Sequence, residues 1–197
     1  MRVLVACEFS QEVCKAFRER GHEAYSCDIL PTEGNPEWHI QDDVLEHLDD
    51  GWDLMIAHPP CTYLTKAGTR WLYAGHKLNQ ERYKKGLEAK EFFMKLWKAN
   101  IPMIVIENPI PHKIFNMPKE TQIIQPYEFG HPFKKSTCLW IKGLLNLKPT
   151  NLVTPEYYID KKGIQHSKLT GWRKKKKSKT FLGIAKAMAE QWGKYEV

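Results

Sequence analysis

The chain has 197 residues, 42% hydrophobic and 27% charged, which are ordinary globular values and exclude wholesale disorder. This length suits one well-packed domain, so we expect residues 1–197 to fold as a single unit. The net charge is +7, but the run 173–179 carries six positive charges. The rest is therefore close to neutral, which favours a local arm for phosphate contact over a wholly basic face; a solvated loop is the alternative.

The cysteines and the apolar runs bear on the location of the protein. Five cysteines stand at positions 7, 14, 27, 61 and 138 without paired spacing, a pattern typical of reduced thiols in the cytoplasm. No apolar run approaches the roughly 18 residues that a membrane span needs, and the amino terminus reads as a strand rather than a signal sequence. We therefore expect a cytoplasmic protein with no membrane partner.

Apolar bursts of strand length alternate along the chain with amphipathic helical stretches. This pattern predicts an α/β, Rossmann-like fold in which a mostly parallel sheet is covered by helices on both faces. The expected strands are 3–6, 23–27, 53–57 and 102–106, and the expected helices are 11–20, 44–48, 77–98 and 181–192. Residues 122–125 and 137–141 read as a hairpin. The segment 58–76 has little periodicity and predicts a long loop over a site, whereas 143–178 is irregular and basic.

The chemically distinctive residues follow the predicted strands. In open α/β sheets the ligand crevice lies beyond the carboxyl ends of the strands. The residues at those ends are Glu8–Ser10, Asp28, Asp43, His58–Cys61 and Glu107–Asn108. An acid after the second strand is the usual partner of ribose hydroxyls, so Asp28 indicates a cofactor that contains a nucleoside. The sequence has no Gly-x-Gly-x-x-Gly and no Walker loop, which argues against a dinucleotide or a triphosphate.

The stretch His58-Pro59-Pro60-Cys61 presents a thiol on a stiff corner, because two prolines continue neither a strand nor a helix. A cysteine nucleophile needs thiolate character and an activated electrophile. Glu107, kept neutral by burial, could activate a heterocycle by donating a proton to a ring nitrogen. Addition of the thiol to C6 of cytosine, followed by methylation at C5, is chemistry of this kind. The alternatives are a buried structural thiol and a helix-capping acid.

Read together, these motifs resemble those of the C5-cytosine DNA methyltransferase family. Pro60-Cys61 is similar to its Pro-Cys motif and Glu107-Asn108 to its Glu-Asn motif, while Phe9-Ser10 is similar to the Phe-Ala of its first cofactor loop. The ordered set spans residues 1–109, and the stretch 178–192, SKTFLGIAKAMAEQW, resembles the closing motif and helix. The chain as a whole resembles short phage- and prophage-encoded members that lack a large target-recognition domain.

The resemblance implies an S-adenosyl-L-methionine-dependent DNA (cytosine-5-)-methyltransferase that works in the cytoplasm, that of the host if a phage encodes it. Cys61 would form the covalent adduct with C6, and Glu107 would contact N3. Asp28 would bind the ribose of the cofactor and Asp43 its adenine amino group. The full implied sets are Phe9, Ser10, Asp28, Asp43 and Pro59 for the cofactor, and Pro60, Asn108, Arg173, Lys174 and Lys175 for DNA.

The chain departs from the family pattern in three places. Gln11 and Glu12 stand where glycines of the cofactor loop are expected. The arginine-bearing motif has no clear counterpart, and its candidate substitutes are Lys134, Lys135 and Arg173. Only the irregular segment 143–178 stands in place of a target-recognition domain. We therefore expect either slight sequence specificity or a protein partner that supplies it.

Three other functions remain open. Exocyclic amino methyltransferases of adenine or cytosine carry Asp/Asn/Ser-Pro-Pro-Tyr at this corner, so His58 and Cys61 disagree with both outer positions. A free cytosine nucleotide as substrate suits the missing recognition domain. A catalytically silent nucleic-acid-binding module suits Gln11 and the missing arginine motif. No metal is expected, since His58, Cys61 and His76 lack a second cysteine pair for zinc.

Overall fold

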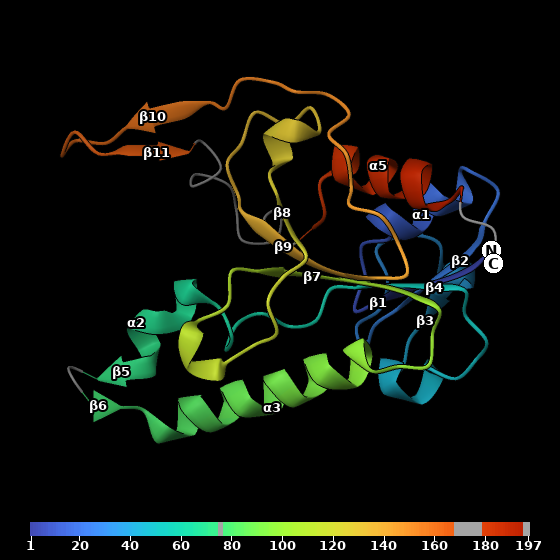
Figure 1. Cartoon of the computed structure of the whole chain (residues 1–197), viewed down its shortest axis with the longest axis horizontal. Coiled ribbons are helices and arrows are strands. Elements are labelled where there is room, and N and C mark those ends of the chain that lie inside the picture. Colours follow the sequence, from blue (N-terminus) through green and yellow to red (C-terminus); the bar gives the residue numbers. More distant parts are fainter. Residues whose placement is uncertain (75–76, 168–178, 195–197) are drawn as a thin grey trace.

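The computed structural model describes residues 1–74, 77–167 and 179–194 (Figure 1). Its centre is a seven-stranded sheet of order β3-β2-β1-β4-β7-β9-β8. In this sheet β9 runs antiparallel to both of its neighbours, and the first five strands are parallel. The strands are β1 (Arg2–Ala6), β2 (Glu23–Cys27), β3 (His39–Ile40), β4 (Leu54–Ala57), β7 (Met103–Pro109), β8 (Gln122–Ile124) and β9 (Thr137–Lys142).

Helices cover both faces of the sheet (Figure 1). The helices α1 (Glu12–Arg18) and α5 (Leu182–Trp192) lie together on one face, and α3 (Gln80–Trp97) crosses the other. Two small units project on the same side of the molecule: α2 (Thr69–Leu72) with β5 (Tyr73–Ala74) and β6 (Lys77–Leu78), and the hairpin of β10 (Tyr157–Ile159) with β11 (Gln165–Ser167). The 3₁₀ turns are Pro36–Trp38, Val44–His47, Lys66–Gly68, Lys113–Phe115 and Pro126–Glu128.

The alternation of side chains along the strands builds two cores. In β1, Val3 and Val5 pack on the side of α1 and α5, while Leu4 and Ala6 pack on the side of α3. All four side chains are fully buried. Because both faces are covered, the strand reads as a continuous apolar run rather than as an alternating one. The predicted fold class, α/β and Rossmann-like with a mostly parallel sheet, is confirmed.

Most predicted elements are present, but β3 was not expected, and the first residues of the helix expected at 77–98 form β6 instead. The expected hairpin is β8 and β9, and it extends the main sheet. The expected helix at 44–48 is a 3₁₀ turn. The segment 58–76, predicted as a loop, contains α2 and β5. The described part of the irregular segment contributes the β10–β11 hairpin.

No helix in the described ranges combines the length and the apolar character required to cross a bilayer.

Candidate active site

A cavity of about 660 Å³ lies beyond the carboxyl ends of β1, β2, β4 and β7. Its volume is within the range of small-molecule and cofactor pockets. Because the parallel strands all end at this edge of the sheet, residues far apart in the sequence meet there. Seven residues of the predicted site line it: Phe9, Asp28, Asp43, Pro59, Pro60, Cys61 and Glu107.

Asp28 occupies the position directly after β2. Its backbone N–H donates to the carbonyl of Ile40 (3.1 Å), and its carboxylate accepts the N–H of Leu30 (2.9 Å). The second bond closes a turn whose apolar residues Ile29 and Leu30 line the same cavity and are 73% and 51% exposed. The cavity therefore has an acid beside an apolar rim, as a nucleoside with a polar sugar and a flat base requires.

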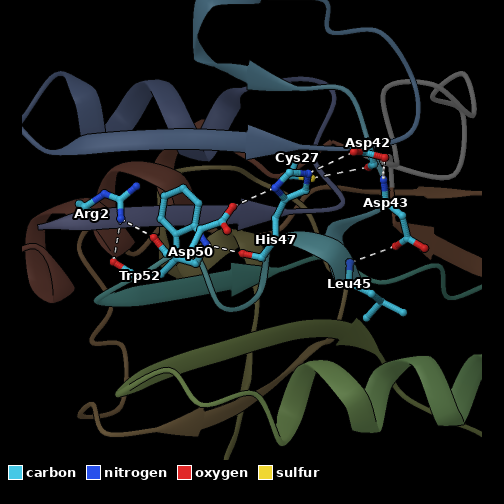
Figure 2. Close-up of polar contacts among 9 residues, drawn as sticks. Arg2, Cys27, Asp42, Asp43, Leu45, His47, Asp50 and Trp52 are labelled. Carbon is cyan, nitrogen blue, oxygen red and sulfur yellow. Dashed lines mark hydrogen bonds and ion pairs between the residues drawn. The ribbon is translucent and has the colours of Figure 1, made fainter.

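Asp43 lines the cavity from the turn Val44–His47, whose first N–H groups it caps. Its carboxylate accepts the N–H of Leu45 (3.0 Å), whereas the adjacent Asp42 carboxylate lies 3.3 Å from His47 Nε2. Figure 2 shows the two acids turned in different directions, Asp42 toward the imidazole and Asp43 away from it. The hydrogen bond to Asp50 (2.9 Å) and that to Asp42 raise the pKa of His47 despite partial burial. Both acids line the cavity, and the imidazole holds the Asp42 carboxylate.

The loop between β1 and α1 uses Gln11 where the family pattern has glycine. Gln11 has φ 60°, and Cys7 has φ 59°, a left-handed conformation that favours glycine. Such residues cost about 1–3 kcal/mol each and persist when their surroundings hold them. The buried Gln11 amide donates to Asn35 O (2.8 Å) and Ser26 Oγ (3.1 Å) and accepts from Asn35 N (2.7 Å). Hydrogen bonds therefore fix the backbone shape that glycine would permit.

Glu8 and Ser10 of the same loop turn inward. The buried Glu8 carboxylate accepts the N–H groups of Val13 (2.8 Å) and Cys14 (3.2 Å) at the start of α1, and the Ser10 hydroxyl donates to it (3.4 Å). Burial raises the pKa of Glu8, and these backbone bonds lower it only in part. Ser10 is 6% exposed and is absent from the cavity wall. Its hydroxyl bonds to Glu8, and contact with the cofactor stays a prediction.

Cys61 stands on the corner that follows β4. Its carbonyl accepts the N–H groups of Leu64 and Thr65 (both 3.2 Å), which closes the chain into a turn directly after the prolines. Burial raises the pKa of the Cys61 thiol, while the positive charge of Lys135 lowers it. Lys135 lines the same cavity. The thiol is thus neutral at rest, beside the cation that favours its ionised form.

Glu107 belongs to β7 and is 14% exposed at its side chain. Its Oε2 lies 3.0 Å from His58 Nδ1 and accepts the hydroxyl of Thr180 (3.3 Å). Burial would raise the pKa of this carboxyl, but the hydrogen bond and charge of His58, with Lys135, lower it to about 2. Burial was expected to keep the Glu107 carboxyl neutral. This expectation is not met, because the contact with the His58 imidazole favours the ionised carboxylate.

Asn108 lies under the corner rather than in the cavity. It is 3% exposed, and its Nδ2 donates to the carbonyl of Pro59 (3.2 Å). It does not line the cavity. Asn108 thus ties β7 to the proline corner that carries Cys61, and its contact with the substrate stays a prediction.

The predicted basic contacts divide into two groups. Arg173, Lys174 and Lys175 lie outside the described residues. Of the candidates for the missing arginine motif, Lys135 lines the cavity, whereas the Lys134 Nζ lies 5.7 Å from the ring centre of Tyr157. Lys135 is thus the described candidate that stands beside the thiol and the carboxylate.

A second hollow of about 500 Å³ adjoins the corner through Thr62 and Tyr63. The Arg82 guanidinium lies 4.9 Å from the centre of the Tyr63 ring and donates to the carbonyl of Thr62 (3.0 Å). Trp71 of α2 also lines this hollow and is 58% exposed. The complete lining is Thr62, Tyr63, Trp71, Asn79, Glu81, Arg82 and Lys85. Aromatic faces beside cations suit a single nucleic-acid strand.

Sequence reasoning missed three groups of the site. It placed His58 at the corner without a catalytic role, although a histidine directly before Pro-Pro-Cys is a signal for a titratable partner there. It placed Glu8 in the loop without a role, although an acid ahead of a helix start is a common capping signal. Thr180, which bonds to Glu107, precedes α5 and offers no signal in the sequence.

Searches against protein-family models and curated proteins find no match to this chain. Similar solved structures include an E. coli prophage protein described provisionally as a DNA modification methyltransferase (13% identity, TM-score 0.43) and the Entamoeba histolytica methyltransferase EhMeth (12% identity, TM-score 0.44). The matches cover 78% and 81% of this chain but 52% and 60% of those chains. Likeness at this level leaves reaction and substrate open.

Proposed function

We propose that the chain is an S-adenosyl-L-methionine-dependent DNA (cytosine-5-)-methyltransferase in which Cys61 bonds covalently to C6 of the target cytosine. One observation carries the proposal: a single cavity is lined by acids after β2 and β3 and by Cys61 and Glu107 at the ends of β4 and β7. In the order of the sheet, the two acids come first and the thiol and carboxylate last. A cofactor and a base could therefore lie side by side along the strand ends.

The cavity has the groups that S-adenosyl-L-methionine would need. Asp28 is placed for the ribose hydroxyls, Asp43 for the adenine amino group, and Phe9 and the apolar rim for the flat base. Pro59 lines the wall next to the reacting corner. When bound, the cofactor supplies an electrophilic methyl group.

The residues of the chain prepare the base. Cys61 adds its sulfur to C6, and Lys135 favours the thiolate that this step needs. Glu107, held by His58 and Thr180, stands at the cavity to contact N3 of the ring. The Asn108 bond to Pro59 keeps the thiol on its corner. These roles make C5 nucleophilic toward the methyl group.

DNA is the substrate we favour over a free nucleotide. A cytosine in a duplex has to leave its stack to reach Cys61, at a cost of roughly a few kcal/mol. The second hollow, with Tyr63, Trp71 and Arg82, offers stacking and charge for the strand that flanks an extruded base. The run 173–179 adds phosphate contact. With one small domain and segment 143–178 as the available recognition region, specificity would be slight or supplied by a partner protein.

Replacing the thiol tests the covalent mechanism. Cys61→Ser should lose methyl transfer from tritiated cofactor and should no longer be trapped on DNA that contains 5-fluorocytosine. The matched control is Cys14→Ser on α1, because a hydroxyl can keep the bond to Ala24 O (3.4 Å for the thiol). It should retain transfer and trapping. Full transfer by Cys61→Ser would reject the covalent mechanism.

Identification of the product separates the other functions. Nuclease digestion and mass spectrometry distinguish 5-methylcytosine from N4-methylcytosine and N6-methyladenine, and a parallel assay with free cytidine nucleotides tests the small substrate. Calorimetry with S-adenosyl-L-methionine tests the silent module. Binding of DNA without binding of the cofactor would contradict the proposed enzyme.

A further inference from the structure

His58 is held at the junction between the corner and β7. Its backbone N–H donates to the carbonyl of Ala6 (2.9 Å), and its side chain lines the cavity while remaining 16% exposed. The Nδ1 atom lies 3.0 Å from Glu107 Oε2. The Nε2 atom is buried and has no hydrogen-bond partner in the described part of the chain. The imidazole therefore interacts with the site mainly through Glu107.

The groups around the imidazole determine where the proton of the pair lies. Since an ionised carboxylate can only accept, the Nδ1 atom must carry the hydrogen of the 3.0 Å contact. Glu107 on β7 and Glu8 after β1 favour a charged imidazole, whereas burial and Lys135, before β9, oppose it. Glu107 and Glu8 prevail, so the resting pair is an imidazolium and a carboxylate that together hold one mobile proton.

A resting carboxylate has no hydrogen to give to N3 of the base. We infer that His58 stores this proton and passes it through Glu107 to N3 of the target ring as Cys61 adds to C6. This inference rests on the proposed function and adds to it a positioning residue that acts through Glu107.

The protons balance both when the thiol adds to the ring and when it is released. As the Cys61 sulfur bonds to C6, its thiol proton leaves to water, and the electrons of the C5–C6 double bond shift through C4 to N3. N3 takes a proton from Glu107, which takes the Nδ1 proton of His58. The imidazole is then neutral and keeps its hydrogen on Nε2. After methylation, water takes the C5 proton, and the electrons of the C5–H bond re-form the C5–C6 double bond as the C6–S bond breaks. The released Cys61 thiolate takes a proton back from water, and the N3 proton returns through Glu107 to His58.

The pH dependence of methyl transfer in His58→Asn tests the relay. The asparagine amide can still donate to Glu107 but cannot release a proton. Wild-type transfer should fall as the pH rises through the titration of His58. At a pH just below the titration of His58, the variant should be slower than the wild type by about 10²-fold or more, the usual contribution of general acid catalysis. It should recover toward acid pH, where Glu107 itself is protonated. A purely structural role of His58 would lower the rate of the variant equally at every pH. That result would overturn the inference, and so would a variant whose rate and pH profile match those of the wild type.

Two controls separate this inference from the proposed function. His22→Asn, at the start of β2 on the opposite edge of the sheet, should keep the wild-type profile. NMR titration of the imidazoles needs no activity: His58 should titrate at a lower pH in Glu107→Gln than in the wild type. An unchanged His58 titration would overturn the pair. If the wild type binds cofactor and DNA but transfers no methyl group, the proposed function fails while the titration still reports on the pair.

Discussion

At the scale of single residues, burial and neighbouring charges have opposite effects on the pKa of Glu107. Burial alone would hold the carboxyl neutral, which suits a proton donor. The His58 imidazole at 3.0 Å, together with Lys135 and Thr180, reverses this and lowers the pKa of the carboxyl to about 2. The proton is not lost from the site, because it lies on the neighbouring atom. A buried acid can therefore be ionised at rest and still act as a donor if its partner supplies the hydrogen.

The same pair predicts how stability varies with pH. Glu107 has a folded pKa of about 2, below its ordinary 4.5, so its contribution is complete above 4.5 and is lost as the pH falls toward 2. The pKa of His58 is raised above its ordinary 6.5, so its contribution is complete below 6.5 and is lost as the pH rises through the folded value. The pair should stabilise the fold most between pH 4.5 and 6.5.

Urea unfolding of Glu107→Gln and of the wild type, measured at a series of pH values, should show this pH range. The variant should lose up to about 3 kcal/mol there, as expected for removal of one partner from a buried ion pair. The loss should shrink below pH 4.5 and above the titration of His58. Glu88→Gln, on the exposed face of α3, is the control for removing a carboxylate. A difference between Glu107→Gln and the wild type that stays constant from pH 3 to pH 9 would contradict the ion pair.

Residue positions at strand ends were predictable, but side-chain directions were not. The pattern of apolar bursts is enough to place Asp28, Cys61 and Glu107 at one edge of a parallel sheet. The His58 contact depends instead on the register of β4 and β7, in which Ala57 pairs with Ile106 and the next residues come side by side. The register of β4 and β7 cannot be deduced from a single sequence. For the same reason, the inward turns of Ser10 and Asn108 appear only in the structure.

At the scale of elements, the segment after the corner has a small core of its own. Leu64, Leu72 and Phe115 pack together and are at most 2% exposed. The ring of Phe115 also stacks against Tyr83 of α3, with centroids 5.8 Å apart. The sequence predicted a loop at 58–76 because α2 and β5 are too short to show periodicity. This core fixes the segment, including Tyr63 and Trp71, against the long helix.

Gly86 is the point where α3 touches this core. Alanine normally stabilises a helix relative to glycine by about 1 kcal/mol. At Gly86, however, a Cβ would lie 2.2 Å from the Phe115 ring. Gly86→Ala should therefore lower the free energy of unfolding, by about 1–3 kcal/mol as for other overpacked cores. Thermal and urea unfolding measure the change.

A second substitution gives the control for this steric argument. Phe115→Leu removes the part of the ring that the new methyl group would meet. In that background Gly86→Ala should be neutral or stabilising, since the helix preference then acts unopposed. If Gly86→Ala stabilises the protein with Phe115 in place, the packing of this segment differs from that described.

At the scale of the whole molecule, the distribution of charge would place DNA binding and methyl transfer, as proposed above, on different parts of the chain. The cavity is lined by Asp28, Asp42, Asp43 and Glu107, against His58 and Lys135 as cationic groups. An acidic wall suits a cofactor with hydroxyl and amino groups but repels a polyanion. Six of the positive charges lie instead in the run 173–179. Affinity for DNA should therefore depend on this run, and affinity for the cofactor should not.

Salt dependence of DNA binding measures that division. Each phosphate contact releases counterions and adds about 0.9 to the slope of log K against log salt on duplex DNA. Replacing lysines 174–177 with serine should lower this slope by about 2–4 and leave calorimetric binding of the cofactor unchanged. The matched control replaces four exposed lysines elsewhere, Lys95, Lys98, Lys148 and Lys186, which gives the same net charge. If both variants lower the slope equally, the overall charge binds DNA, and the run 173–179 has no special contact with phosphate.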